Sequence, residues 1–166
     1  LREVAPHVRR SALLANREAL MHFPDIARFQ GIEILPARVD YPGEYDDAFA
    51  LIRRLGADSL IAASGPPNVV NAERIAAFCA ASRLPAIYGF REAVAVGGLV
   101  SYGVNVPSLF RQMGRMTARF LDGAKLGDVP IEQPTTFELV ANLKTAKALG
   151  LTIPLPVLAQ ADEVIE

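Results

Sequence analysis

Apolar and polar positions follow two alternating patterns along the chain. Short runs in which almost every residue is apolar predict buried strands, because they are too short for a helix and too uniformly apolar for a surface strand. The longer segment GIEILPARVD alternates around Ile32, Ile34 and Val39 and also predicts a strand. Strands are therefore expected at residues 11–15, 31–40, 58–64, 85–89, 98–103 and 135–142.

Between the first strands, apolar residues recur at helical spacing. The segment 44–56 predicts a helix that ends at Gly56, and the segment 72–83 predicts a second helix that turns Ile75 and Phe78 inward. The residues between Asn16 and Gly31 favour a helix less clearly, because Pro24 interrupts the apolar series Leu20, Phe23, Ile26, Ala27 and Phe29.

Strands that alternate with helices, each strand apolar throughout, predict an α/β fold. The expected architecture is a mostly parallel sheet with helices on both faces. Every crossover between parallel strands should then be right-handed.

The pattern changes after Gly103. Residues 104–123 predict a long helix with Pro107 in its first turn, Gly123 at its end and one apolar stripe formed by Phe110, Met113, Thr117, Phe120 and Leu121. A polar, proline-rich connector leads to the last predicted strand. Asn142 should cap a helix that ends at Gly150, and a short helix is expected after Pro156.

Composition excludes several classes of protein. The chain has 166 residues, of which 51% are hydrophobic and 21% charged, with a net charge of −1. A core can be buried, but no electrostatic field is available to hold nucleic acid. The single cysteine, Cys79, cannot form an internal disulfide, and its apolar surroundings predict a buried, inert thiol. The opening LREVAPHVRR lacks the apolar run of a signal peptide, so the leader of an exported protein would lie outside this sequence.

Sequence motifs for catalysis, nucleotide phosphates or metals are missing. The chain has no GxxxxGK[ST], GxGxxG, HExxH or paired CxxC, and its two histidines, His7 and His22, have no nearby nucleophile or carboxylate partner. Ser64-Gly65 lies where a nucleophilic serine could stand, but the preceding glycine of GxSxG is absent. No cofactor, metal or catalytic residue is predicted.

The remaining candidates are loops at the carboxyl ends of the predicted parallel strands, where α/β sheets bind their ligands. Each has a simpler interpretation: Asn16 as a helix cap, SGPP as a strand terminator, the tyrosines as core aromatics, and Glu92 as an exposed carboxylate. Four such loops at one edge nevertheless favour a binding site. Its candidate residues are Asn16, Ser64, Gly65, Pro66, Tyr88, Gly89, Phe90, Glu92, Ser101 and Tyr102.

Residues 84–154 carry a series of motifs in one order: YGFRE, GGLVSYG, KLGDVPIEQPTTFELV and NLKTAKALGL. This segment resembles the C-terminal half of the ABC transporter substrate-binding proteins of the tryptophan/tyrosine-type family, which have the type I periplasmic-binding-protein fold. The opening LREVAPHVRRSALLAN resembles the same family more loosely. The segment after Asn16 is shorter than the family's helix, which leaves the role of its loop open.

The resemblance implies one lobe of a two-lobed clamshell that closes over a small molecule. Residues 1–97 would form the second lobe, residues 98–125 a crossover strand and helix that packs on a first lobe, and residues 126–166 the return strand and C-terminal helices. Gly97-Gly98 would lie near the hinge between lobes.

The resemblance also implies a binding mode without catalysis. Tyr88, Phe90 and Tyr102 would accept an apolar or aromatic group, Glu92 an ammonium, and Ser64 with backbone N–H groups after SGPP a carboxylate. The implied ligand is amino-acid-like, aromatic or branched. The implied partner is the membrane permease of an ABC importer, and the location is periplasmic or exported.

The family's proteins are nearly twice this length, so a first lobe is missing from this chain. The apolar helix stripe around Phe110 would then be uncovered, which predicts a homodimer or larger assembly through Phe110, Met113, Thr117 and Phe120. Two alternatives stay open: an oligomerising α/β module without ligand, and a small α/β enzyme at the same strand edge.

Overall fold

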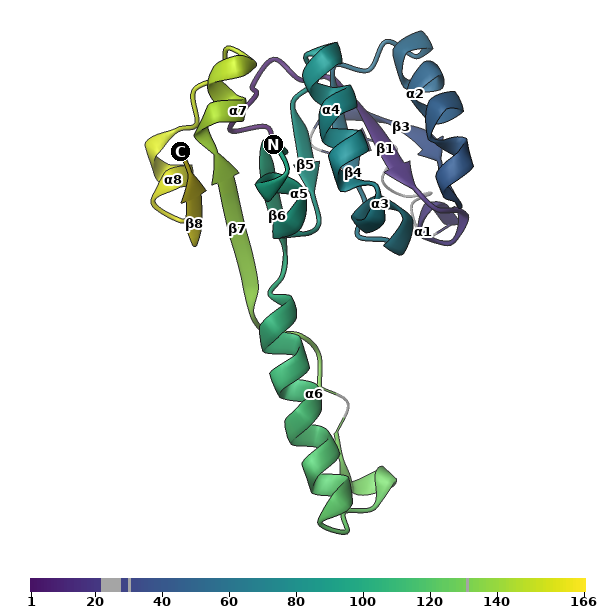
Figure 1. Cartoon of the computed structure of the whole chain (residues 1–166), viewed down its shortest axis with the longest axis vertical. Helices are drawn as coiled ribbons and strands as arrows, with labels where there is room; N and C mark the ends of the chain where they lie inside the picture. The colour runs from purple at the N-terminus through teal and green to yellow at the C-terminus, as the bar shows by residue number, and fades with distance from the viewer. Residues whose placement is uncertain (22–27, 30, 131) are drawn as a thin grey trace.

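The computed structural model describes residues 1–21, 28–29, 31–130 and 132–166. A body of strands and helices carries a single long helix that projects away from it (Figure 1). The predicted helix between Asn16 and Gly31 is described only as α1 (Arg17–Met21), and Phe23, Ile26 and Ala27 lie outside the described residues.

The eight strands of the body form one sheet in the order β2-β3-β1-β4-β5-β6-β7-β8. Neighbouring strands are parallel except for the pairs β2–β3 and β6–β7. The prediction of a mostly parallel α/β sheet is therefore confirmed. The strand bounds are β1 (Arg10–Ala15), β2 (Arg28–Phe29), β3 (Ile32–Arg38), β4 (Ser59–Ala62), β5 (Ala86–Tyr88), β6 (Val100–Val104), β7 (Phe137–Asn142) and β8 (Glu163–Ile165).

Helices cover both faces of this sheet, as predicted. On β5, Ala86 and Tyr88 belong to one buried cluster, whereas Ile87 between them packs on the other. The first cluster lies under α2 (Tyr45–Arg54), α4 (Ala72–Ser82) and α5 (Arg91–Ala95), and the second under α7 (Leu143–Ala148) and α8 (Leu155–Leu158). The short helix α3 (Pro66–Val70) precedes α4, and single 3-10 turns lie at Pro42–Glu44 and Leu126–Asp128.

Several short elements differ from the sequence expectations. No helix was predicted between the fourth and fifth strands, where the structure has α5, whose Ala93 and Val94 are buried. The last helix begins at Leu155, before Pro156, because a proline fits the first turn of a helix. The residues after it form β8, and an ion pair between Arg91 and Glu163 joins β8 to α5.

The local backbone geometry requires glycine at Gly97 and Gly98. Gly97 has a φ of +106° at the end of α5, and a Cβ at Gly98 would lie 2.6 Å from the Ala93 carbonyl oxygen. Both therefore allow the tight turn from α5 into β6, and their role as a hinge between lobes stays a prediction.

Helix α6 (Val106–Leu121) forms the projecting arm (Figure 1). The side chain of Asn105 caps it by accepting a hydrogen bond from the Ser108 N–H at 2.9 Å. The returning chain lies along the helix, since Gln112 Nε2 donates to Glu132 at 2.9 Å. None of the residues of α6 is buried. Within the described part of the chain, no helix has the length and apolar character needed to cross a membrane.

Candidate functional site

The carboxyl ends of β4, β5 and β6 meet at one edge of the sheet. Ala62 pairs with Tyr88, and Tyr88 pairs with Ser101, so the loops that follow these strands begin side by side. The loop after β1, which begins at Asn16, joins the same edge because β1 lies next to β4. The loops after β1, β4 and β5 are thus neighbours in space. The fourth predicted loop, residues 101–103, is instead part of β6, which continues to Val104 beyond its pairing with β5.

Glycines allow these strand ends to approach closely. A Cβ at Gly89 would lie 1.7 Å from Ser64 Oγ and 3.1 Å from Ser64 Cα, and a Cβ at Gly103 would lie 1.8 Å from the Gly89 carbonyl oxygen. Any larger residue would push the three loops apart. Gly103 is therefore required by the backbone of Gly89, and Gly89 by the side chain and Cα of Ser64.

Three cavities open around Ser64 and Gly89. The first, of about 310 Å³, is lined by Asn16, Ser64, Gly65 and Pro66 among others, and the second, of about 20 Å³, by Tyr88, Gly89, Phe90 and Glu92. The third, of about 340 Å³, lies between Ser64, Gly89 and Tyr102. Of the predicted site residues, Ser101 alone lines none of these cavities: it is buried, and its hydroxyl has no partner among the described residues.

Some polar groups around the first cavity already make hydrogen bonds within the protein. Asn16 accepts a hydrogen bond from the Ala19 N–H at 3.0 Å, so it caps α1 while it lines the cavity. The expectation of backbone N–H groups for a carboxylate after SGPP is wrong, because Pro66 and Pro67 have no N–H and those of Gly65 and Asn68 donate to Ala63 and Gly65 carbonyl oxygens. The exposed Ser64 remains the polar side chain of this loop.

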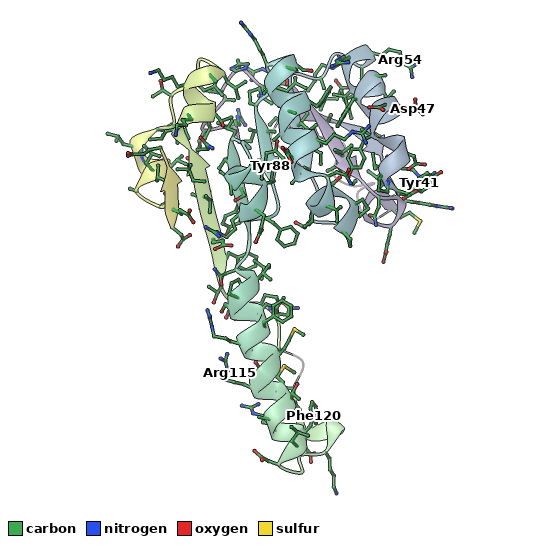
Figure 2. The ribbon with its side chains drawn as sticks, viewed as in Figure 1. Tyr41, Asp47, Arg54, Tyr88, Arg115 and Phe120 are labelled. Carbon is green, nitrogen blue, oxygen red and sulfur yellow. The ribbon has the colours of Figure 1, made fainter. Side chains whose placement is uncertain are left out.

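Tyr88 lies inside the body of the molecule (Figure 2). Its ring belongs to the core cluster and its edge reaches the second and third cavities. Burial raises the pKa of the Tyr88 hydroxyl, and the neighbouring Cys79 thiol raises it further. The simpler interpretation, a core aromatic, therefore describes most of this side chain. Cys79 itself is buried, and burial raises the pKa of its thiol to about 12.

Tyr102 differs from Tyr88 because its side chain is exposed. It lines the third cavity, and its ring stacks on Phe137 with centroids 5.9 Å apart and planes 17° apart. Glu92 is exposed beside the second cavity and Phe90 is half-buried there.

Several lining residues were not predicted from sequence. The third cavity has an apolar wall made by Leu13, Ile61 and Ile87, and strands that are apolar on both faces give no signal of which residues line it. Asn68 was also missed. It accepts from the Tyr45 hydroxyl at 2.8 Å and donates to the Leu14 and Ala63 carbonyl oxygens, which ties α3 to the ends of β1 and β4.

The edge presents surfaces that suit binding. Among the described residues, no three His, Cys, Asp or Glu side chains gather in a way that could hold a metal ion. What the strand ends and loops present is an apolar wall, an exposed aromatic ring, a serine hydroxyl and a carboxylate, distributed over three neighbouring cavities. Such a surface suits a small, mainly apolar molecule with a few polar groups.

Comparisons with known proteins agree with this description. The model of the family described as ABC transporter substrate binding protein matches residues 14–165. Among curated protein sequences, none matches the chain.

Solved structures share the fold at low sequence identity. An ABC domain in complex with L-Trp from Streptococcus pneumonia superposes with a TM-score of 0.89 at 24% identity, over 99% of this chain and 57% of that chain. A conserved domain protein from Vibrio cholerae gives 0.88 at 22% identity, over 98% and 57%. A ligand-free, open substrate-binding protein with adhesive properties from Clostridium difficile gives 0.72 at 18% identity, over 99% and 57%. The chain thus spans little more than half the length of these proteins.

Proposed function

Because the chain belongs to the family of ABC transporter substrate-binding proteins, we propose that its strand edge captures a small molecule without changing it chemically. One observation carries this proposal: three cavities lie where the ends of neighbouring parallel strands meet, the first lined by Ser64, the second by Gly89 and the third by both. In open α/β sheets this edge is where ligands bind.

The proposed ligand is amino-acid-like with an aromatic or branched side chain. The wall of Leu13, Ile61 and Ile87 can bury an apolar side chain, with Tyr102 on one side and the Ser64 hydroxyl at the polar end. The exposed carboxylate of Glu92 is available to an ammonium group. The L-Trp bound to the Streptococcus domain supports this class of ligand.

The wider role follows from the family. We propose that residues 1–97 and 126–166 belong to the second lobe of a two-lobed binding protein, that residues 98–125 cross toward a first lobe, and that the protein works outside the cytoplasm, where it delivers its ligand to an ABC permease. Ligand affinity of this lobe should be lower than that of a complete clamshell, because enclosing contacts from one side are absent.

The test is direct ligand binding. L-tryptophan, L-tyrosine and L-leucine are titrated into the purified chain by calorimetry. Tyr102→Leu is compared with Tyr41→Leu, because Tyr41 is equally exposed (59% and 60%) but is not among the residues that line the three cavities. We expect saturable binding of at least one amino acid that Tyr102→Leu weakens and Tyr41→Leu leaves unchanged. The proposal fails when none of these amino acids binds saturably, or when both variants bind alike.

A second function has one observation in its favour. The apolar stripe of α6 is exposed, with Phe110 63% and Leu121 83% accessible, and such a stripe is normally covered. We therefore also propose that copies of the chain associate through Phe110, Met113, Thr117 and Phe120. A small enzyme at the same edge has no such support and is not proposed.

A further inference from the structure

Tyr102 and Phe137 form an exposed aromatic pair beside the third cavity. Tyr102 lies on β6 opposite Leu139 of β7, so Phe137 is the diagonal neighbour of Tyr102 on the same face of the sheet. The two rings are nearly parallel, with an angle of 17° and a centroid distance of 5.9 Å. Tyr102 is among the residues that line the third cavity, and Phe137 is not.

Neither ring is part of the core. Tyr102 is 59% and Phe137 47% exposed, and neither belongs to one of the two buried clusters. An exposed tyrosine on a strand is free to change its χ1 rotamer unless a neighbour restricts it. The Phe137 ring supplies that restriction, because stacked aromatic rings prefer a defined offset geometry.

The orientation of Tyr102 determines what the cavity presents to a ligand. The apolar lining beside Tyr102 consists of the aliphatic side chains Leu13, Ile61 and Ile87 on the same face of the sheet, which contact any apolar group by burial alone. An aromatic ring held at a fixed angle contributes more binding energy with a flat aromatic group than with a branched aliphatic one. The reason is that pairs of aromatic rings gain energy beyond that of their buried area.

We propose that Phe137 is a positioning residue that fixes the Tyr102 ring and thereby makes the site selective for ligands with a planar aromatic side chain. This inference rests on the proposed binding function. It concerns the ratio of affinities for aromatic and aliphatic amino acids, whereas the proposed function concerns binding itself.

The experiment compares Phe137→Leu, Phe137→Tyr and Tyr41→Leu with the unmodified chain. L-tryptophan and L-leucine are titrated by calorimetry, and the chain contains no tryptophan, so indole fluorescence reports the bound L-tryptophan independently. Phe137→Leu should weaken L-tryptophan binding about three- to tenfold and L-leucine binding about twofold or less. Phe137→Tyr, which keeps a ring, and Tyr41→Leu should retain the original ratio.

Other outcomes overturn the inference. An equal loss for both ligands in Phe137→Leu would mean that Phe137 only supports the strand, and unchanged affinities for both would mean that it does not orient Tyr102. If the unmodified chain binds none of L-tryptophan, L-tyrosine and L-leucine, the proposed function fails and the inference with it. If it binds L-leucine at least as tightly as L-tryptophan, the function stands and the inference alone is wrong. Circular dichroism of each variant verifies that it is folded.

Discussion

At the scale of single residues, close backbone contacts shape the candidate site. Gly89 lies directly against Ser64, and Gly103 against the carbonyl group of Gly89. The Ser64 side chain occupies the space beside Gly89, and the Gly89 backbone occupies the space beside Gly103 in β6. Substitution at such a position has to move backbone, which is more costly than rotating a side chain.

Gly89→Ala should lower the free energy of unfolding by about 1–3 kcal/mol, because the added methyl group would overlap Ser64 and force the β4 and β5 loops apart. Urea denaturation measures this loss. Gly65→Ala is the matched control: its Cβ would meet no atom closer than 3.8 Å, so a change within about 0.5 kcal/mol is expected. Equal stability of Gly89→Ala and the original chain would contradict the close contact.

The buried thiol predicts a dependence of stability on alkaline pH. Burial raises the pKa of Cys79 from its ordinary value of 9.0 to about 12 in the folded chain. The unfolded chain therefore releases this proton first, so the contribution of Cys79 is complete below pH 9 and is lost as the pH rises toward about 12. Denaturation midpoints measured across this window should fall, and Cys79→Ala should reduce the slope of the fall.

Cys79→Ala also leaves a small cavity, which lowers stability at every pH. The stability of this variant at alkaline pH is therefore compared with its own stability at neutral pH and not with that of the original chain. A thiol reagent gives an independent result: Cys79 should react only after unfolding. Rapid reaction of the native chain, or an unchanged slope in Cys79→Ala, would show that the thiol is accessible.

At the scale of elements, two asparagines cap helices with different surroundings. Asn142 accepts from the Thr145 N–H at 3.0 Å and is buried, while its amide donates to the Val94 carbonyl oxygen at 3.2 Å. Asn105 caps α6 in the same way, and its amide donates to the half-buried Glu138.

Asn142→Ala should therefore cost about 2–3 kcal/mol, the sum of a lost cap and an unsatisfied buried carbonyl group. Asn105→Ala should cost about 1 kcal/mol, since water can replace the amide at Glu138. The measurement is the difference between the unfolding free energies of the two variants. Similar losses of unfolding free energy would show that the buried hydrogen bond of the Asn142 amide does not add to stability.

The elements found from sequence are those with a strong local signal. Periodicity and cap residues alone predicted the long strands and helices and the Asn142 cap. They also predicted the glycines that end helices, all with positive φ: Gly56, Gly123 and Gly150. The short elements α5 and β8 were missed because they are stabilised by contacts distant in sequence. An example is the ion pair of Arg91 with Glu163, which are 72 residues apart.

At the scale of the whole molecule, the projecting helix is notable for its exposed apolar stripe. Phe120 and Arg115 lie on different sides of α6 (Figure 2), so the helix has an apolar side and a basic side. The returning connector contacts Gln112 and Arg119 and leaves the Phe110 stripe exposed.

Sedimentation velocity over a range of concentrations should show association of the chain, because burial of this stripe stabilises a dimer by removing apolar surface from water. Phe110→Gln combined with Met113→Gln should shift the chain to monomer, whereas Arg111→Gln combined with Arg115→Gln, on the opposite side, should not. A monodisperse monomer at high concentration would refute association through α6.

The sequence by itself determined the order and type of the main elements, the parallel sheet covered on both faces, and the loops at its carboxyl edge. These depend on local periodicity and on the rule that parallel strands end together. Only the tertiary structure decided that Tyr88 is mostly core while Tyr102 is exposed beside Phe137, and that Ser101 lines no cavity at this edge. It also decided that the N–H groups of Gly65 and Asn68, beside the two prolines, donate to carbonyl oxygens of the same loop. Side-chain direction and hydrogen-bond partners depend on strand register and on residues far away in the chain, and an apolar run does not record them.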